Sequence, residues 1–147
     1  MRRVLTPLLV PLALASLCLP LRGQDQNILL PIELIEARLA REPFEILARQ
    51  DVRFEGDRTQ RVALGFADGS AIVVKWGTAP RGGTDFNNQP RYEVAAYLLQ
   101  KLFLDDPDYV VPPTALRAVP LDWYRAYDAR AAPTYDRTSS VLVALQY

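Results

Sequence analysis

The 147-residue sequence contains no histidine, and its single cysteine, Cys18, lies in an apolar run near the start. The absence of histidine excludes Ser-His-Asp hydrolysis, imidazole general-base catalysis and zinc sites with histidine ligands. If that apolar run is removed, the remaining chain has neither disulfides nor a thiol nucleophile. Without histidine and cysteine ligands, only carboxylate metal sites remain, and these suit Mg²⁺ or Ca²⁺.

Lysine is also scarce, because the 17 basic residues comprise 15 arginines and two lysines, Lys75 and Lys101. Lys75 follows the apolar, mostly β-branched run 71–74. A compact, strongly hydrated amine at the end of a strand suits a nucleotide phosphate. The alternative is a surface lysine whose stem covers apolar side chains while its amine reaches water.

Residues 1–23 have the pattern of a secretory signal peptide. A basic start precedes an uncharged apolar run with several prolines, and the small residue Gly23 follows. Leu21 is bulky for a position close to a cleavage site, so an uncleaved membrane anchor is the alternative. Lipidation of Cys18 is disfavoured by Leu17, where bacterial lipoprotein signals usually carry a small residue. The pattern predicts an exported protein, periplasmic or extracellular.

The whole sequence carries 17 basic and 17 acidic residues. Removing residues 1–23, which hold three arginines and no acid, leaves 14 minus 17, or a net charge of −3. A weakly acidic chain lacks the basic surface that nucleic acids require, so we expect no nucleic-acid partner. The remaining residues suffice for one modest domain.

The rest of the chain divides into a short helical segment, 24–43, and a domain, 44–147. Pro31 suits the first turn of an amphipathic helix in the first part. Residues 44–54 mix apolar and polar residues, and a first strand is one interpretation of them. Asp68-Gly69 between two apolar runs predicts a β-hairpin that follows a polar loop, residues 55–60.

A second helix is expected from Tyr92 to Phe103, with Asn88 as its cap and Pro90 in its first turn. Its apolar spacing predicts one buried face made of Ala95, Leu98, Leu99 and Leu102. A turn at 105–108 and a proline-containing extended segment at 109–114 come next, and the apolar run 140–147 reads as a buried strand. The fold class is therefore α+β, an antiparallel sheet of about four or five strands with the helix that carries Glu93 packed on it.

Alternation along the second hairpin strand places Val73 and Lys75 on one face, opposite three bulkier side chains. A flat ligand could lie on this face, although both faces could equally be core. The turn length decides what the partner strand adds to the Lys75 face: Val62 and Leu64 for a two-residue turn, or Ala63 and Gly65 for a three-residue turn.

Glu93 lies in the first turns of the second helix, 18 residues after Lys75. The small residue Ala96 would let helix and sheet approach, so that the carboxylate could orient the ammonium group toward a phosphate. The alternative is a glutamate that the helix dipole favours near any helix start.

The order of these elements resembles the smaller, nucleotide-binding lobe of protein-kinase-like phosphotransferases. The segments 66–75 and 92–99, followed by Val110 to Thr114, are most similar to the atypical HipA-type, CotH-type and phosphoinositide-kinase-like branches. The resemblance covers residues 47–147. It departs from the family pattern in the single glycine of the 55–60 loop and in the absence of a larger lobe.

The resemblance implies ATP with Mg²⁺ as the ligand, with Lys75 on a phosphate and Glu93 orienting Lys75. The other nucleotide-binding residues that it implies are Gly56, Thr59, Gln60, Val73 and Gln146. It assigns no catalytic residue and no metal ligand here, because these lie in the larger lobe of the family. We therefore expect a truncated phosphotransferase that binds nucleotide weakly and transfers no phosphate alone.

Two other functions stay open. The aromatic segment 122–137 could stack on sugars or peptides in a secreted, non-catalytic interaction module, or its rings could form an irregular loop that covers the core. A helper subunit could instead pair its C-terminal strand with a missing larger lobe or another protein. That third reading predicts a large apolar surface at 142–147.

Overall fold

The computed structural model describes residues 28–51, 59–85 and 89–147, which form an α+β fold on a five-stranded antiparallel sheet. The strands follow the order β1 (Glu45–Asp51), β2 (Thr59–Gly65), β3 (Ala71–Thr78), β5 (Ser140–Gln146) and β4 (Thr114–Pro120). The predicted α+β class and strand number are confirmed. The predicted signal peptide, Gly56 and Asn88 lie outside the described residues.

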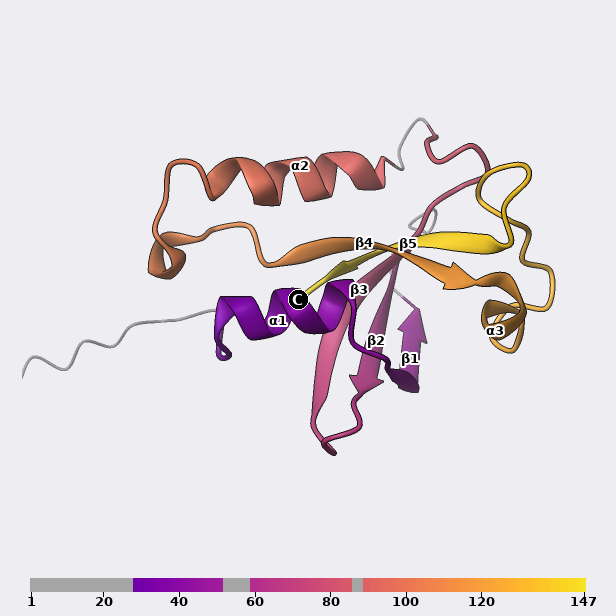
Figure 1. Ribbon diagram of the computed structural model, residues 1–147, viewed down its shortest axis with the longest axis horizontal. Coiled ribbons are helices and arrows are strands. Elements are labelled where there is room, and N and C mark those ends of the chain that lie inside the picture. The colour runs from indigo at the N-terminus through magenta and orange to yellow at the C-terminus, as the bar shows by residue number, and fades with distance from the viewer. Residues whose placement is uncertain (1–27, 52–58, 86–88) are drawn as a thin grey trace, which may run out of the picture.

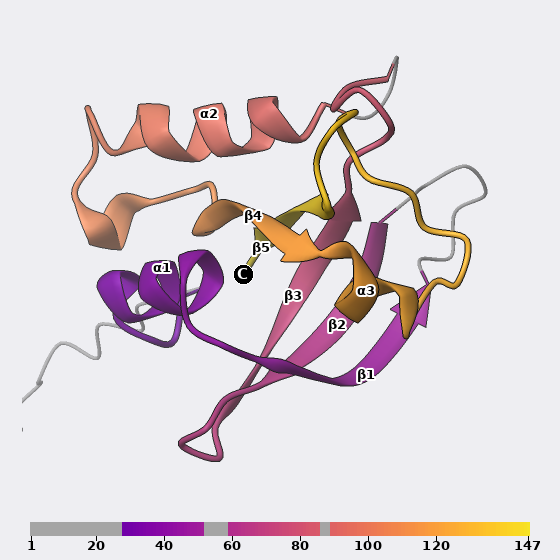
Figure 2. The ribbon, with the colours of Figure 1, turned by 45° about the vertical axis from the view of Figure 1, so that its right-hand side comes forward.

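Helices cover both faces of the sheet. The helices are α1 (Ile32–Ala40), α2 (Pro90–Gln100) and α3 (Leu121–Arg125), with a short 3₁₀ helix at Asp106–Asp108. Figures 1 and 2 show α1 and α2 on opposite sides of β4, and α3 near the far end of that strand. Within the described part of the chain, no helix combines the length and apolarity needed to cross a membrane.

The predicted hairpin about Asp68-Gly69 is confirmed, and its turn has three residues. Phe66 N donates to Ser70 O at 2.9 Å, which encloses residues 67–69. Gly69 has a φ of 80°, a conformation that glycine adopts without strain, and the Asp68 carboxylate accepts a hydrogen bond from Ser70 N. The resulting register pairs Ala63 with Val73 and Gly65 with Ala71, as the three-residue alternative requires.

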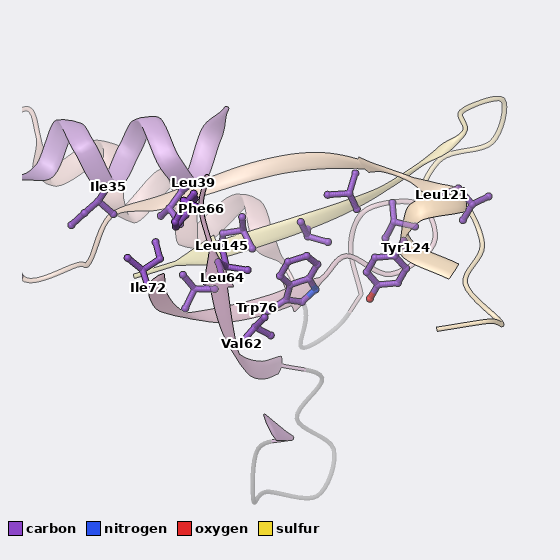
Figure 3. Packing of buried hydrophobic residues seen from close by; sticks show 14 residues of the cluster. Ile35, Leu39, Val62, Leu64, Phe66, Ile72, Trp76, Leu121, Tyr124 and Leu145 are labelled. Atoms are coloured by element: carbon purple, nitrogen blue, oxygen red, sulfur yellow. The ribbon is translucent and has the colours of Figure 1, made fainter. Parts of the chain in front are cut away.

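The core lies on the face of the sheet opposite Lys75, because the β-branched and aromatic residues alternate with smaller or polar ones. Ile35 and Leu39 of α1 pack against one end of this face (Figure 3). Tyr124 of α3 closes the other end, where its ring stacks on Trp76 with centroids 6.3 Å apart. The sheet residues between them are Val62, Leu64, Ile72, Val74, Val119, Val141, Val143 and Leu145.

The predicted buried face of the second helix is wrong. Leu98, Leu99 and Leu102 are exposed, and Ala95 is exposed with them. The helix turns Tyr97 and Gln100 toward the sheet instead. The spacing of the leucines correctly identified one apolar side of the helix. Hydrogen bonds of Tyr97 and Gln100 nevertheless turn a different side toward the sheet.

The aromatic rings of 122–137 do not form one exposed patch. Tyr124 is buried in the core, Trp123 and Tyr127 are half-buried side by side at centroids 4.9 Å apart, and Tyr135 alone is exposed. This arrangement matches the reading in which the segment covers the core. The segment also contains a helix, α3, where the sequence suggested an irregular loop.

The apolar surface expected at 142–147 is not exposed. β5 lies between β3 and β4 inside the sheet, so both of its edges are paired. Val143, Ala144 and Leu145 are buried. The predicted buried strand is thus confirmed, whereas the prediction of a large apolar surface there is wrong.

Candidate functional site

Lys75 and Glu93 meet across the contact between sheet and helix. Lys75 Nζ lies 2.9 Å from Glu93 Oε1, and the two side chains are 43% and 36% exposed. Alternation in β3 directs Lys75 away from the core, and the first turns of α2 carry Glu93 over that face. The ammonium group therefore has a fixed partner and still reaches solvent, where an anionic ligand could contact it.

The sheet surface beside Lys75 carries several small side chains. Val73 lies two residues before Lys75 on the same face and is 46% exposed. The register adds Ala63 opposite Val73, and Ala48 of β1 opposite Ala63. α2 covers the part of this face that β4 and β5 form, so β1, β2 and β3 supply the open surface.

Arg61 is a candidate that sequence reasoning missed. The register of β2 and β3 places it directly opposite Lys75, on the same face, where it is exposed. The two cations lie side by side on this face, with Glu93 paired to Lys75, and a phosphate could contact both. The turn length of the hairpin carried the missing information, because the three-residue register puts odd-numbered residues of both strands on this face.

Thr59 and Gln60, two other predicted site residues, lie on different faces of the sheet. Thr59 and Gln60 belong to β2 and not to a loop, which corrects their predicted placement. Thr59 shares the Lys75 face, but Gln60 pairs with Trp76 on the opposite face. The Gln60 amide there bonds Asp51 Oδ1 at 2.7 Å and accepts from the Arg49 guanidinium. Gln60 therefore lies on the face opposite Lys75.

Gln146 lies next to Lys75 on the neighbouring strand. The two residues are register partners between β3 and β5, and they point to the same face. The Gln146 side-chain amide donates to Thr114 Oγ1 at 3.1 Å on β4. Gln146 thus borders the site, with its amide nitrogen held by Thr114.

Glu93 is positioned by the rest of α2, which is anchored by polar contacts. The Gln100 side chain accepts hydrogen bonds from Val110 N and Val111 N at 3.0 and 2.8 Å, and it donates to Val111 O. Tyr97, one turn beyond Glu93, donates its hydroxyl to Glu36 Oε1 of α1 at 2.6 Å. These contacts fix the side of α2 that faces the sheet.

Glu36 is the point where α1 and α2 meet. Its carboxylate accepts from the Tyr97 hydroxyl and also pairs with Lys101. Glu36 therefore binds one residue within α2 and one directly after the helix ends. Burial by itself raises the pKa of Glu36, but hydrogen bonds from Lys101 and Tyr97 outweigh it and hold that pKa below its ordinary value. Burial and the bond to Glu36 raise the pKa of Tyr97, which keeps its hydroxyl protonated as a donor.

Two hollows that described residues border lie away from Lys75 and Glu93. One of about 550 Å³ is bordered by Phe44, Leu47, Gly65 and Trp123, and a smaller one of about 220 Å³ shares Phe44 and Trp123. Neither is lined by Lys75 or Glu93. Lys75, Val73 and Arg61 are all exposed on the Lys75 face among the described residues.

Among the described residues, no group of three or more histidine, cysteine, aspartate or glutamate side chains is placed to hold a metal ion. In comparisons with known proteins, the chain matches no protein-family model, no curated protein sequence and no solved structure.

Proposed function

We propose that this chain is an exported, kinase-like nucleotide-binding lobe that binds Mg-ATP on the Lys75 face and is catalytically incomplete by itself. The observation that carries the proposal is the ion pair of Lys75 with Glu93 at 2.9 Å. A lysine held by a helix carboxylate, with its amine reaching solvent, is suited to contact a phosphate in a defined position.

The surface beside the ion pair fits the remainder of a nucleotide. Ala48, Ala63 and Val73 leave room above the sheet for a flat base, and their apolar surface favours its stacking. Arg61 adds a second cation beside Lys75 for the phosphates. In this proposal Mg²⁺ arrives with the nucleotide, held by phosphate oxygens.

The proposal covers binding and not phosphate transfer. The resemblance places the catalytic aspartate and the magnesium ligands of the family in the larger lobe, and no residue of this chain is assigned those roles. The described residues supply a sheet face, and a single face buries less of a ligand than an enclosed pocket does. We therefore expect weak binding.

Thermal unfolding of the full chain with and without Mg-ATP tests the proposal. A ligand that binds the native state at 100 times its dissociation constant adds about 2.7 kcal/mol to the free energy of unfolding. We expect the melting temperature to rise with Mg-ATP concentration. In Lys75→Met, which keeps the length of the side chain but removes its charge, this rise is expected to be lost.

Lys101→Met is the matched control. Lys101 is the only other lysine in the sequence, and it too pairs with a glutamate, Glu36. Its replacement should leave the response to Mg-ATP unchanged, whatever it does to the melting temperature without ligand. An equal response in wild type and Lys75→Met would refute the Lys75 assignment.

A further inference from the structure

The smaller of the two hollows, about 220 Å³, lies beside β4, the last strand of the sheet. Its walls come from β4, from α3 and from the segment that joins α1 to β1 (Figure 2). Trp123 of α3 meets Phe44 of that segment edge to face, with ring centroids 5.7 Å apart, and Pro43 and Pro120 border the hollow as well. These flat, apolar walls suit a small ring.

Only two of the described residues that border this hollow have polar side chains, Arg117 and Trp123. An arginine guanidinium group and an indole N–H both donate hydrogen bonds, and neither accepts one. Within the described part of the chain, the indole N–H of Trp123 forms no hydrogen bond. The side chains of the hollow therefore favour a ligand that accepts hydrogen bonds.

Arg117 uses only part of its guanidinium group for contacts with the described chain. Nη1 donates to Glu42 O at 2.6 Å and to Arg38 O at 3.4 Å, and the group lies over the Phe44 ring at 4.6 Å from its centroid. Nε and Nη2 form no hydrogen bond to any described residue. These two nitrogens make up one planar edge, and a carboxylate binds such an edge through two parallel hydrogen bonds.

The charge of Arg117 has no acidic partner among the described residues. Glu42, whose backbone oxygen accepts from Arg117, pairs its carboxylate with Arg38 at 3.5 Å instead. Burial lowers the pKa of Arg117, because the charged form loses hydration that no carboxylate replaces. An anion in the hollow would offset this loss, since a partly buried charge is stabilised by an opposite charge that bonds to it.

We propose that the smaller hollow binds a small aromatic carboxylate, whose carboxylate group accepts from Arg117 Nε and Nη2 and whose ring packs against Trp123. One negative charge matches the one cation among the described residues that border the hollow. A phosphate monoester carries about 1.5 to 2 negative charges at neutral pH, and the described lining offers no second cation for it. The hollow is also smaller than the roughly 300–1,000 Å³ of pockets for drug-sized ligands, so the ligand is limited to about one ring.

This site does not depend on the nucleotide proposal. Arg117 shares its face of β4 with Val119, a core residue, whereas Lys75 lies on the opposite face of the sheet. A ligand of one ring that makes two or three hydrogen bonds should bind with a dissociation constant in about the millimolar range. The two sites can be tested separately, with benzoate for this hollow and Mg-ATP for the Lys75 face.

Indole N–H signals in NMR spectra of the full chain, followed during a titration with benzoate, test the inference. The sequence has two tryptophans, and Trp123→Phe identifies the signal of the one that borders the hollow. We expect the Trp123 signal to shift and saturate, while the buried Trp76 indole, which donates to Thr78 Oγ1, changes little. Benzamide keeps the ring without the charge and acetate keeps the charge without the ring, so neither should saturate the signal at the same concentration. No saturating shift with benzoate, or an equal one with acetate or benzamide, would overturn the proposal.

Two arginine substitutions test the contact with the carboxylate. Arg117→Lys keeps the positive charge but loses the planar edge, so the dissociation constant for benzoate should rise at least about tenfold. Arg125→Gln is the matched control, because it removes an exposed arginine of α3 close to Trp123, and it should leave the constant unchanged. Equal binding by wild type and Arg117→Lys, or an equal loss in Arg125→Gln, would overturn the assignment of Arg117. The comparison of benzoate with acetate and benzamide needs only wild type, so it decides the question even if Arg117→Lys fails to fold.

Discussion

The hydrogen bond from Tyr97 to Glu36 should contribute measurably to stability, because it joins α1 to α2 at a buried site. Tyr97 is 1% exposed, and its hydroxyl lies 2.6 Å from a carboxylate oxygen. A hydrogen bond to a charged group contributes about 1.5–3 kcal/mol. Because the Glu36 side chain is 32% exposed and also pairs with Lys101, solvent and the second partner reduce this to about 1–2 kcal/mol.

Urea unfolding of Tyr97→Phe measures this contribution, since the substitution removes the hydroxyl and keeps the ring. With a denaturant dependence of about 2 kcal/mol per molar, the transition midpoint should fall by roughly 0.5–1 M. Tyr92→Phe is the matched control, because Tyr92 lies on the same helix with its ring exposed, and it should leave the midpoint unchanged. If Tyr97→Phe unfolds at the wild-type midpoint, the hydrogen bond from Tyr97 to Glu36 does not stabilise the fold.

Three further predictions concern Glu36, Leu145 and Lys75. First, the pKa of Glu36 lies below its ordinary value, so its ionised form stabilises the native state above about pH 4.3 and this stability is lost as the pH falls through the lowered pKa. Glu36→Gln should therefore show a flatter loss of stability in acid than wild type, as denaturant unfolding at several pH values would show. Second, Leu145→Ala should cost about 2–5 kcal/mol because Leu145 is fully buried, whereas Leu99→Ala in dilute protein should cost less than about 0.5 kcal/mol. If calorimetry gives equal losses of stability for the two substitutions, Leu99 must be buried in solution, contrary to the structure. Third, Lys75→Met should change stability without ligand by less than about 1 kcal/mol, because its ion pair is partly solvated, and a larger loss would make Lys75 a structural residue.

Local signals in the sequence predicted most of the fold. Asp68-Gly69 identified the hairpin, and the apolar run at 140–147 identified the strand β5. Period-two alternation in β3 placed Val73 and Lys75 together on the face opposite the core, as the structure has them. Each of these inferences depends on residues close together in the chain, because turn conformation and the alternation of side chains along a strand are set by neighbouring residues.

Inferences that needed distant residues were incomplete or wrong. The leucines of α2 have the spacing of a buried face, but Tyr97 and Gln100 are buried because Glu36 and the backbone of Val110 and Val111 provide their hydrogen bonds. Those partners come from separate parts of the chain, so helical periodicity carries no information about them.

The site residues also divide into those that the local sequence identified and those that depended on strand register. The spacing of Lys75 and Glu93 suggested their ion pair, which the fold forms. Arg61 escaped notice because a shift of one residue in strand register moves every side chain to the other face. Gln60 was expected in a loop, whereas it belongs to β2 and lies on the face opposite Lys75. The three-residue turn settled that register, and the sequence had left the turn length open.

Backbone amide NMR of the full chain during a titration with Mg-ATP tests the central claim most directly. The account predicts chemical-shift changes concentrated at Ala63, Val73, Lys75, Glu93 and Gln146, which the fold brings to one face, and their loss in Lys75→Met. No changes at millimolar Mg-ATP, or changes concentrated around Phe44 and Trp123 instead, would contradict a nucleotide site on the Lys75 face.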